Sequence, residues 1–250
     1  MKRIWISVLA CTGLFSGDLL GQEIGKDDLT ILYRNEMNGG PVFHSQGWGL
    51  TFKRGIHITG SKKRLFEVEY VGLKHPKEVK SVNPFFDNTK SYIYGKVNTL
   101  SMLRLGYGMQ YVIAGKDGLN GVEIRFLHYT GATFGLAKPV YLEILKPTSE
   151  PFEFNISTER YQPLIHFPDN IYGRAPFTKG LGQLAVHPGL YAKTGLAFEY
   201  GPLQEEVKAI EVGVALDVYP KDVHIMAAEF VPSRNYFLTF YLSLLYGKKW

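Results

Sequence analysis

Hydrophobic and polar residues alternate with a period of two along most of the chain, which is the pattern of β-strands with two unlike faces. Eight segments carry it: 29–37, 42–54, 64–73, 96–113, 121–136, 184–200, 207–219 and 236–247. Several are longer than the roughly five or six residues of an average soluble strand. They reach the roughly 9–11 residues that a strand needs to cross a bilayer. The pattern therefore predicts an all-β, membrane-spanning protein.

The polar face of these segments carries charges of both signs. The charged residues assigned to it are Glu67, Glu69, Glu123, Glu199, Glu211, Asp217, Arg34, Lys53, Arg104, Arg125 and Lys193. Acids and bases on one face suit a barrel lumen filled by ion pairs, with Glu67 and Glu69 bound to Arg104 or Arg125. A solvated outer face of a soluble sheet is the alternative that alternation alone leaves open.

Connection lengths support the barrel, because outer-membrane barrels have short periplasmic turns and longer outside loops. The predicted inside turns are short: 55–63, 114–120 and 201–206. The predicted outside connections are 38–41, 74–95, 137–183 and 220–235. The first of these is the exception, since Asn38-Gly39-Gly40 is typical of a tight hairpin turn. We predict a closed antiparallel transmembrane β-barrel of about eight strands with long extracellular loops, or ten strands if 137–183 contains two more.

The N-terminus predicts an export signal. Lys2 and Arg3 precede a short apolar stretch, and a small residue suitable for cleavage follows at Gly21. The expected organisation is a signal peptide at 1–21 and an outer-membrane barrel at 22–250. Cys11, the single cysteine, lies inside the signal, so the mature chain is expected to contain no disulfide. Lipidation of Cys11 is a second reading that the sequence leaves open.

The last predicted strand supports both location and closure. Apolar residues such as Leu238 and Phe240 alternate with Thr239 and Ser243, and the chain stops on Trp250. An alternating, aromatic-ended final strand is typical of proteins inserted into the outer membrane of Gram-negative-type bacteria. We expect it to close the barrel by pairing with the first strand near Ile31–Met37.

Charge and motifs add little chemistry. The net charge of +5 is dispersed, and Lys62-Lys63-Arg64 is interpreted as a solvated turn, so no nucleic-acid partner is predicted. No metal, nucleotide or hydrolase motif is present in the sequence. By parity, His128 faces lipid or the aromatic girdle, whereas His187 shares the lumen face with Glu199. No catalytic, cofactor-binding or metal-binding residue is predicted, and an enzymatic function is not favoured.

Four stretches carry a resemblance to a known group. They are Gly47-Trp48-Gly49-Leu50, Lys62-Lys63-Arg64-Leu65-Phe66-Glu67, His75-Pro76-Lys77-Glu78-Val79-Lys80-Ser81-Val82-Asn83-Pro84 and Lys138-Pro139-Val140-Tyr141-Leu142-Glu143. The chain resembles uncharacterised outer-membrane β-barrel proteins of Bacteroidota over most of its mature length. In size and design it is loosely similar to the small barrel component of the type IX secretion system. The resemblance implies location and brings no functional residue with it.

Three functions fit this interpretation. The favoured one is a structural or accessory role in an envelope or secretion assembly, with protein partners bound through 74–95 and 137–183 and outer-membrane lipid around the barrel. The second is an enzyme that modifies outer-leaflet lipid, which requires a histidine beside a serine or carboxylate at the outer rim. The third is a narrow channel or ligand carrier, although about eight strands leave an interior that side chains can fill.

Overall fold

The computed structural model describes residues 33–86, 89–116, 121–148, 154–200 and 205–250. The predicted signal peptide at 1–21, with Cys11, lies outside these residues. Among the described residues, no helix is long and apolar enough to cross a membrane.

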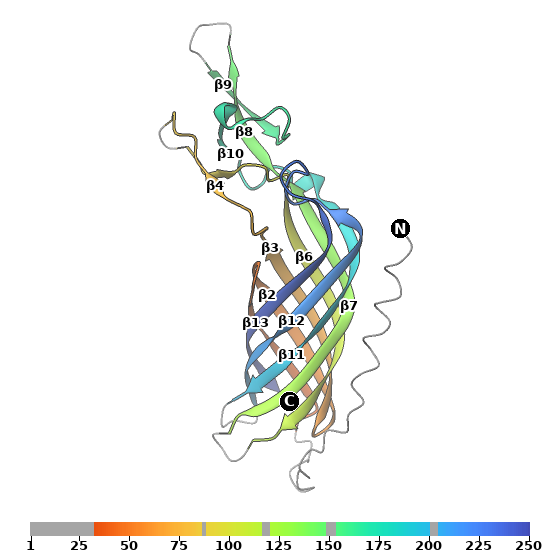
Figure 1. The fold of residues 1–250 in the computed structure, drawn as a ribbon. Helices are drawn as coiled ribbons and strands as arrows, with labels where there is room; N and C mark the ends of the chain where they lie inside the picture. The colour runs from red at the N-terminus through yellow and green to blue at the C-terminus, as the bar shows by residue number, and fades with distance from the viewer. Residues whose placement is uncertain (1–32, 87–88, 117–120, 149–153, 201–204) are drawn as a thin grey trace, which may run out of the picture.

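Eight antiparallel strands form one closed ring (Figure 1), as the alternation predicted. Their bounds are β1 Asn35–His44, β2 Gly47–Thr59, β3 Lys62–Leu73, β6 Asn98–Ala114, β7 Glu123–Pro139, β11 Ala185–Glu199, β12 Glu206–Val223 and β13 Arg234–Lys249. Around the ring the order is β1, β13, β12, β11, β7, β6, β3 and β2. Asn35 and Trp250 exchange two backbone hydrogen bonds, of 2.8 and 2.9 Å, at the seam.

The first hairpin differs from its prediction. Asn38, Gly39 and Gly40 lie inside β1 and pair with β2, and Asn38 and Gly39 also pair with β13, so the hairpin turn falls at residues 45–46. The predicted closure near Ile31–Met37 is therefore shifted, since β13 pairs with Glu36–His44. The glycines are needed for close strand packing, because a Cβ on Gly40 would lie 1.9 Å from the Leu244 carbonyl oxygen.

The outward faces of the barrel strands form an apolar belt between charged residues. On β13 the belt residues are Tyr236, Leu238, Phe240, Leu242, Leu244 and Tyr246, all exposed. Exposed Arg234 precedes this series and exposed Lys248 follows it. Apolar side chains that face outward around a closed ring need a surrounding solvent that is itself apolar, and a bilayer core supplies it.

The connections are sorted by length at the two ends of the barrel. At the end where β1 begins and β13 ends they are residues 60–61, 115–122 and 200–205. At the opposite end, beyond the short turn at 45–46, they are residues 74–97, 140–184 and 224–233. The predicted division into short inside turns and long outside connections is confirmed, with the tight outside turn at 45–46 instead of 38–41.

The two longest connections fold into a structure that extends beyond the barrel (Figure 1), which we call the projection. Its elements are β4 Lys80–Ser81, β5 Tyr92–Ile93, β8 Tyr141–Pro147, β9 Phe154–Arg160, β10 Ile171–Arg174 and the 3-10 turns η3 Pro168–Asn170 and η4 Leu181–Gln183. The connection after β7 thus contains extra strands, but they form a separate three-stranded sheet and the ring keeps eight strands.

Candidate functional site

A chain of buried ion pairs crosses the middle of the lumen. Lys193 bridges Glu67 at 2.7 Å and Glu69 at 2.6 Å, and Arg104 bridges Glu69 at 2.5 Å and Asp217 at 2.5 Å. At the other end of this chain of contacts, Lys53 pairs with Glu67 and with Glu211. The predicted lumen position of these residues and the pairing of Glu69 with Arg104 are confirmed. The pairing of Glu67 with an arginine is wrong, because Glu67 binds Lys53 and Lys193 instead.

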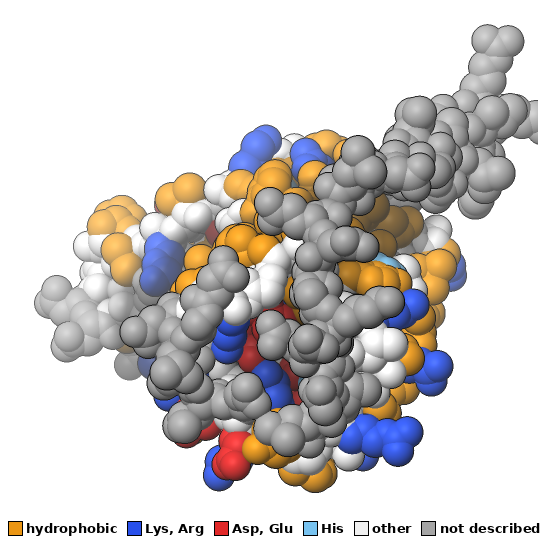
Figure 2. All heavy atoms as spheres, turned by 90° about the horizontal axis from the view of Figure 1, so that it is seen from below, with side chains coloured by type: hydrophobic (Ala, Val, Ile, Leu, Met, Phe, Trp, Pro, Cys, Tyr) orange, Lys and Arg blue, Asp and Glu red, His pale blue; other side chains and the backbone are white. Residues whose placement is uncertain are grey.

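A second group of ion pairs lies nearer the short turns. Lys63 donates to both carboxylate oxygens of Glu36, at 2.7 and 2.6 Å. Arg125 contacts Glu123 at 2.6 Å and Glu199 at 3.2 Å. Seen from that end, Figure 2 shows acidic and basic side chains at the centre, with hydrophobic side chains around them.

Two charged residues were assigned wrongly from the sequence. Lys63 is 3% exposed and belongs to β3, so its interpretation as part of a solvated turn is wrong. Its parity with Leu65 and Glu67 was the available signal, but the predicted strand began at residue 64, whereas β3 begins at Lys62. Arg34, assigned to the lumen face, is exposed just before β1. Sequence reasoning also missed Glu36, although it lies in the predicted segment 29–37 and shares the parity of Arg34.

Three buried tyrosines fill space between the ion pairs: Tyr129, Tyr191 and Tyr241. Glycines on facing strands make room for them. A Cβ on Gly106 would lie 1.7 Å from the Tyr191 hydroxyl oxygen. Tyr191 donates to Glu67 at 3.2 Å, so the ring is fixed at its polar end.

An apolar layer closes the outer mouth of the lumen. Residues 224–233, which we call the mouth segment, place Ile225, Met226 and Val231 against the inner wall of the barrel. Backbone bonds hold this segment to the residues before β6. Val97 N–H donates to Ile225 at 2.9 Å, and Ala227 N–H donates to Gly95 at 2.7 Å.

The lumen that results is packed. A cavity beside the second group of ion pairs has a volume of about 10 Å³, and its lining includes Glu36, Lys53 and Lys63. That is room for roughly one water molecule. The described residues therefore leave no space in this part of the lumen for an aqueous channel or an organic ligand.

The projection has its own apolar core. Tyr92, Leu142, Ile144, Tyr161 and Ile171 are buried together in it. Tyr161 also accepts a hydrogen bond from the Gly95 amide at 3.2 Å, and burial raises the pKa of its hydroxyl to about 12. The projection is therefore a folded unit above the barrel.

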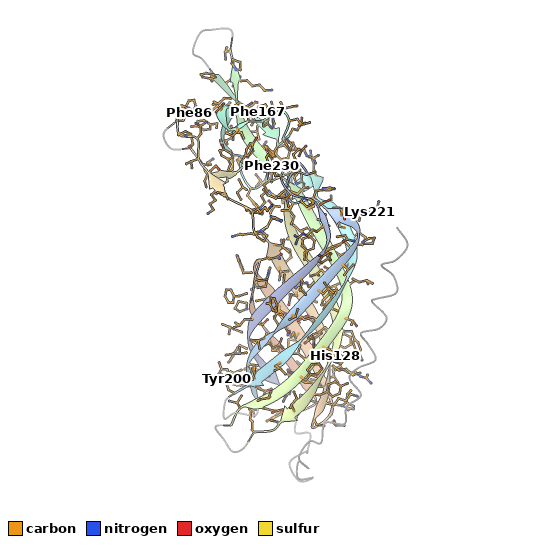
Figure 3. All side chains as sticks on the ribbon, viewed as in Figure 1. Phe86, His128, Phe167, Tyr200, Lys221 and Phe230 are labelled. Carbon is orange, nitrogen blue, oxygen red and sulfur yellow. The ribbon has the colours of Figure 1, made fainter. Side chains whose placement is uncertain are left out.

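The histidines do not form a catalytic arrangement. His128 lies on the outer wall of the barrel (Figure 3) and stacks on Tyr111 with ring centroids 5.9 Å apart, as its parity predicted. His187 has lumen parity but lies near the outer end of β11, whereas Glu199 ends that strand at the opposite side of the membrane. The structure does not bring these two together.

One histidine–carboxylate contact occurs in the projection. His166 Nε2 lies 3.4 Å from Glu159, and Ser157 donates to the same carboxylate at 2.8 Å. Hydrogen bonds from Lys146 and Ser157 hold the pKa of Glu159 below its ordinary value. The serine is bonded to the acid and not to the imidazole, so this group lacks the nucleophile–base pair of a hydrolase. No group of three or more potential metal ligands is present among the described residues.

The closed ring, the apolar belt and the ion-paired lumen define an eight-stranded transmembrane β-barrel. Single-chain barrels of even strand number, with short turns at one end and long loops at the other, belong to the outer membrane of Gram-negative-type bacteria. This protein is an outer-membrane β-barrel of that class.

Solved structures of small outer-membrane barrels have similar folds. Neisserial surface protein A matches with a TM-score of 0.41 and 10% identity, over 87% of this chain and 97% of that one. Ail, the attachment invasion locus protein of Yersinia pestis, matches with a TM-score of 0.42 and 8% identity, over 87% and 99%. OprG from Pseudomonas aeruginosa matches with a TM-score of 0.35 and 8% identity, over 87% and 96%. No protein-family model and no curated protein matches the sequence.

Proposed function

We propose that this protein is an accessory barrel of an envelope assembly, which anchors the projection at the cell surface and binds a partner protein through it. The observation that carries the proposal is the direct continuation of the barrel wall into the projection. β7 ends at Pro139 and β8 begins at Tyr141, so a single residue separates them. A contact made on the projection is thereby held in a fixed position relative to the membrane.

The surface of the projection supports a binding role. Phe85, Leu164 and Phe167 are 76%, 77% and 53% exposed, and Figure 3 shows Phe167 in the projection, far from the barrel. Large apolar side chains exposed outside the membrane are candidates for contact with a partner protein. The packed lumen also supports a binding role for the projection. Because the lumen has no room for a ligand, the outside connections are the better candidates for binding.

The sequence resemblance extends the proposal to the kind of assembly. Similarity to Bacteroidota barrels, and the looser similarity to the small barrel of the type IX secretion system, favour an assembly of the Bacteroidota envelope that handles exported proteins. Both remain part of the proposal.

Replacement of residues 142–174 by a short Gly/Ser linker tests the role. We expect the barrel to insert and the partner to be lost from pull-downs of detergent-solubilised outer membranes. The double variant Leu164→Ser/Phe167→Ser is the milder test, since it leaves the projection core intact and should reduce partner recovery. Unchanged partners in both variants would overturn the proposal.

A further inference from the structure

The three-stranded sheet of the projection has two edges, formed by β10 and β9 on either side of β8. The β10 edge is short and covered. It has four residues with a bulge in its pairing to β8, and Asn83 donates to the Ile171 carbonyl at 2.7 Å. The Lys90 backbone also approaches Gly173 closely, since a Cβ there would lie 2.8 Å from the Lys90 carbonyl oxygen. Such features protect a sheet edge from pairing with another chain.

Among the residues that the structure describes, the β9 edge has none of these features. β9 has seven residues, pairs with β8 without a register shift, and contains neither proline nor lysine. The register also shows which backbone groups face outward. Tyr161 N–H donates to Val140 at 2.9 Å, and this pair continues the β8–β9 register. Because bonding alternates along an antiparallel strand, the groups of Phe154, Ile156, Thr158 and Arg160 point away from β8.

These four residues offer a ladder of free donors and acceptors. Among the described residues, no hydrogen bond is made to their backbone N–H or C=O groups. Their side chains share one face of the sheet and are exposed, with Phe154 at 54% and Ile156 at 47%. An extended peptide can add to such an edge through main-chain hydrogen bonds, and alternate side chains then supply specificity.

We propose that the β9 edge captures an extended segment of a partner protein as an added antiparallel strand. The inference rests on the proposed function, and it specifies where and how the partner binds. Arg160 calls for an acidic residue opposite it, whereas Ile156 and Phe154 call for apolar residues. The antiparallel segment therefore carries an acid first, then an aliphatic residue four positions later and an aromatic residue two positions after that.

A second copy of this chain does not suit the edge. Two barrels in one membrane are related by a two-fold axis along the membrane normal, and β9 runs roughly along the barrel axis (Figure 1). The two β9 strands would then run in the same direction, whereas the same strand pairs with itself symmetrically only in the antiparallel arrangement. A different protein chain is the occupant that the geometry favours.

The test uses the full mature chain in lipid nanodiscs and a labelled peptide, Glu-Thr-Thr-Ser-Val-Thr-Phe, which places the three recognition residues opposite Arg160, Ile156 and Phe154. Thr158→Pro removes one outward N–H at the strand edge, and Thr158→Ala is its matched control, which keeps the N–H. We expect Thr158→Pro to weaken peptide binding about tenfold or more and Thr158→Ala to change it less than about twofold. The reversed peptide should bind about tenfold more weakly than the original.

Amide hydrogen exchange supplies a readout that does not depend on affinity. Binding should slow the exchange of the Ile156 and Thr158 amides in the wild type, while the Ser157 amide, already bonded to β8, stays unchanged. The same measurement on free Thr158→Pro reports whether β8 and β9 remain paired. Failure of the peptide to bind the wild type, or equal binding by Thr158→Pro and Thr158→Ala, overturns the inference.

The natural partner separates this inference from the proposed function. If the partner is lost on replacement of 142–174 but still binds folded Thr158→Pro, the proposed function stands and the inference about the β9 edge is wrong. A partner retained after replacement of 142–174 removes the proposed function, whatever the peptide does.

Discussion

The lumen and the projection both contain ion pairs, but the two regions place them in different surroundings. In the lumen, Glu69 is fully buried between Lys193 and Arg104. In the projection, the side chains of Glu159 and its partner Lys146 are 32% and 56% exposed. Removing one partner of a buried ion pair lowers the stability of the fold much more than removing one partner of an exposed pair. The reason is that a charge left alone in the interior cannot be solvated by water.

Apolar side chains follow the opposite arrangement in the two regions. Phe240 faces outward from the barrel and is 64% exposed, whereas Ile144 faces the inner core of the projection and is 3% exposed. The apolar side chains of this chain are therefore arranged for two different surroundings, lipid around the barrel and water around the projection. Variants matched between the regions show how far this contrast holds.

The largest effect is expected from breaking the lumen ion pairs. Glu69→Gln leaves Arg104 and Lys193 short of a charge partner and should lower the free energy of unfolding by about 3–5 kcal/mol. Glu159→Gln in the projection is the matched control and should cost less than about 1 kcal/mol. Urea unfolding of the protein in lipid vesicles measures both. Equal losses in the two variants would contradict the contrast.

A charge placed on the lipid-facing belt should have the next largest effect. Phe240 lies near the middle of the belt on β13, so Phe240→Lys should destabilise the folded barrel by about 2–4 kcal/mol. Phe167→Lys introduces the same charge into the projection, where water solvates it, and should leave barrel stability unchanged. The fraction of barrel folded in vesicles, read from heat-modified migration on gels, is the measurement. If Phe167→Lys were the more harmful variant, the membrane boundary inferred here would be wrong.

Glycine substitutions compare packing in the two regions. The added methyl in Gly106→Ala meets the Tyr191 hydroxyl and should cost about 1–3 kcal/mol. A Cβ on Gly182, in the connection that contains the projection, would have no heavy atom within 4 Å. Gly182→Ala should therefore be close to neutral. In the double variant Gly106→Ala/Tyr191→Phe the colliding oxygen is absent. Its loss of unfolding free energy should therefore be smaller than the sum of the losses in the two single variants.

The smallest effect concerns the acid in the projection. Hydrogen bonds from Lys146 and Ser157 lower the pKa of Glu159 from its ordinary value of 4.5. Since the folded pKa is the lower one, its stabilising contribution is present above the unfolded pKa and is lost as pH falls through the folded pKa. An NMR titration of the Glu159 carboxyl should give a midpoint below 4.5, and Lys146→Met should raise that midpoint. A wild-type midpoint at or above 4.5 would contradict the hydrogen-bonded arrangement.

The local sequence was misleading at Asn38-Gly39-Gly40, because the same motif can form a hairpin turn or a closely packed strand. Asn38-Gly39-Gly40 has the composition of a hairpin turn, yet the same small residues permit close approach of β1 to its neighbours. Pairing with the neighbouring strands β2 and β13 decides between the two, and β13 lies at the far end of the chain. The error moved the first strand toward the N-terminus, and a late start for β3 left Lys63 outside the predicted strand.

The alternation by itself determined the number of barrel strands, the positions of all but the first and most of the charges that enter the lumen, because the period of two is imposed by the pleat of a strand. It also determined which end carries the long connections. Only the tertiary structure decided which acid meets which base, that the mouth segment closes the lumen, and that β9 is left as an open edge. These features depend on register and on contacts between segments far apart in the chain, and the order of residues along one strand does not contain that information.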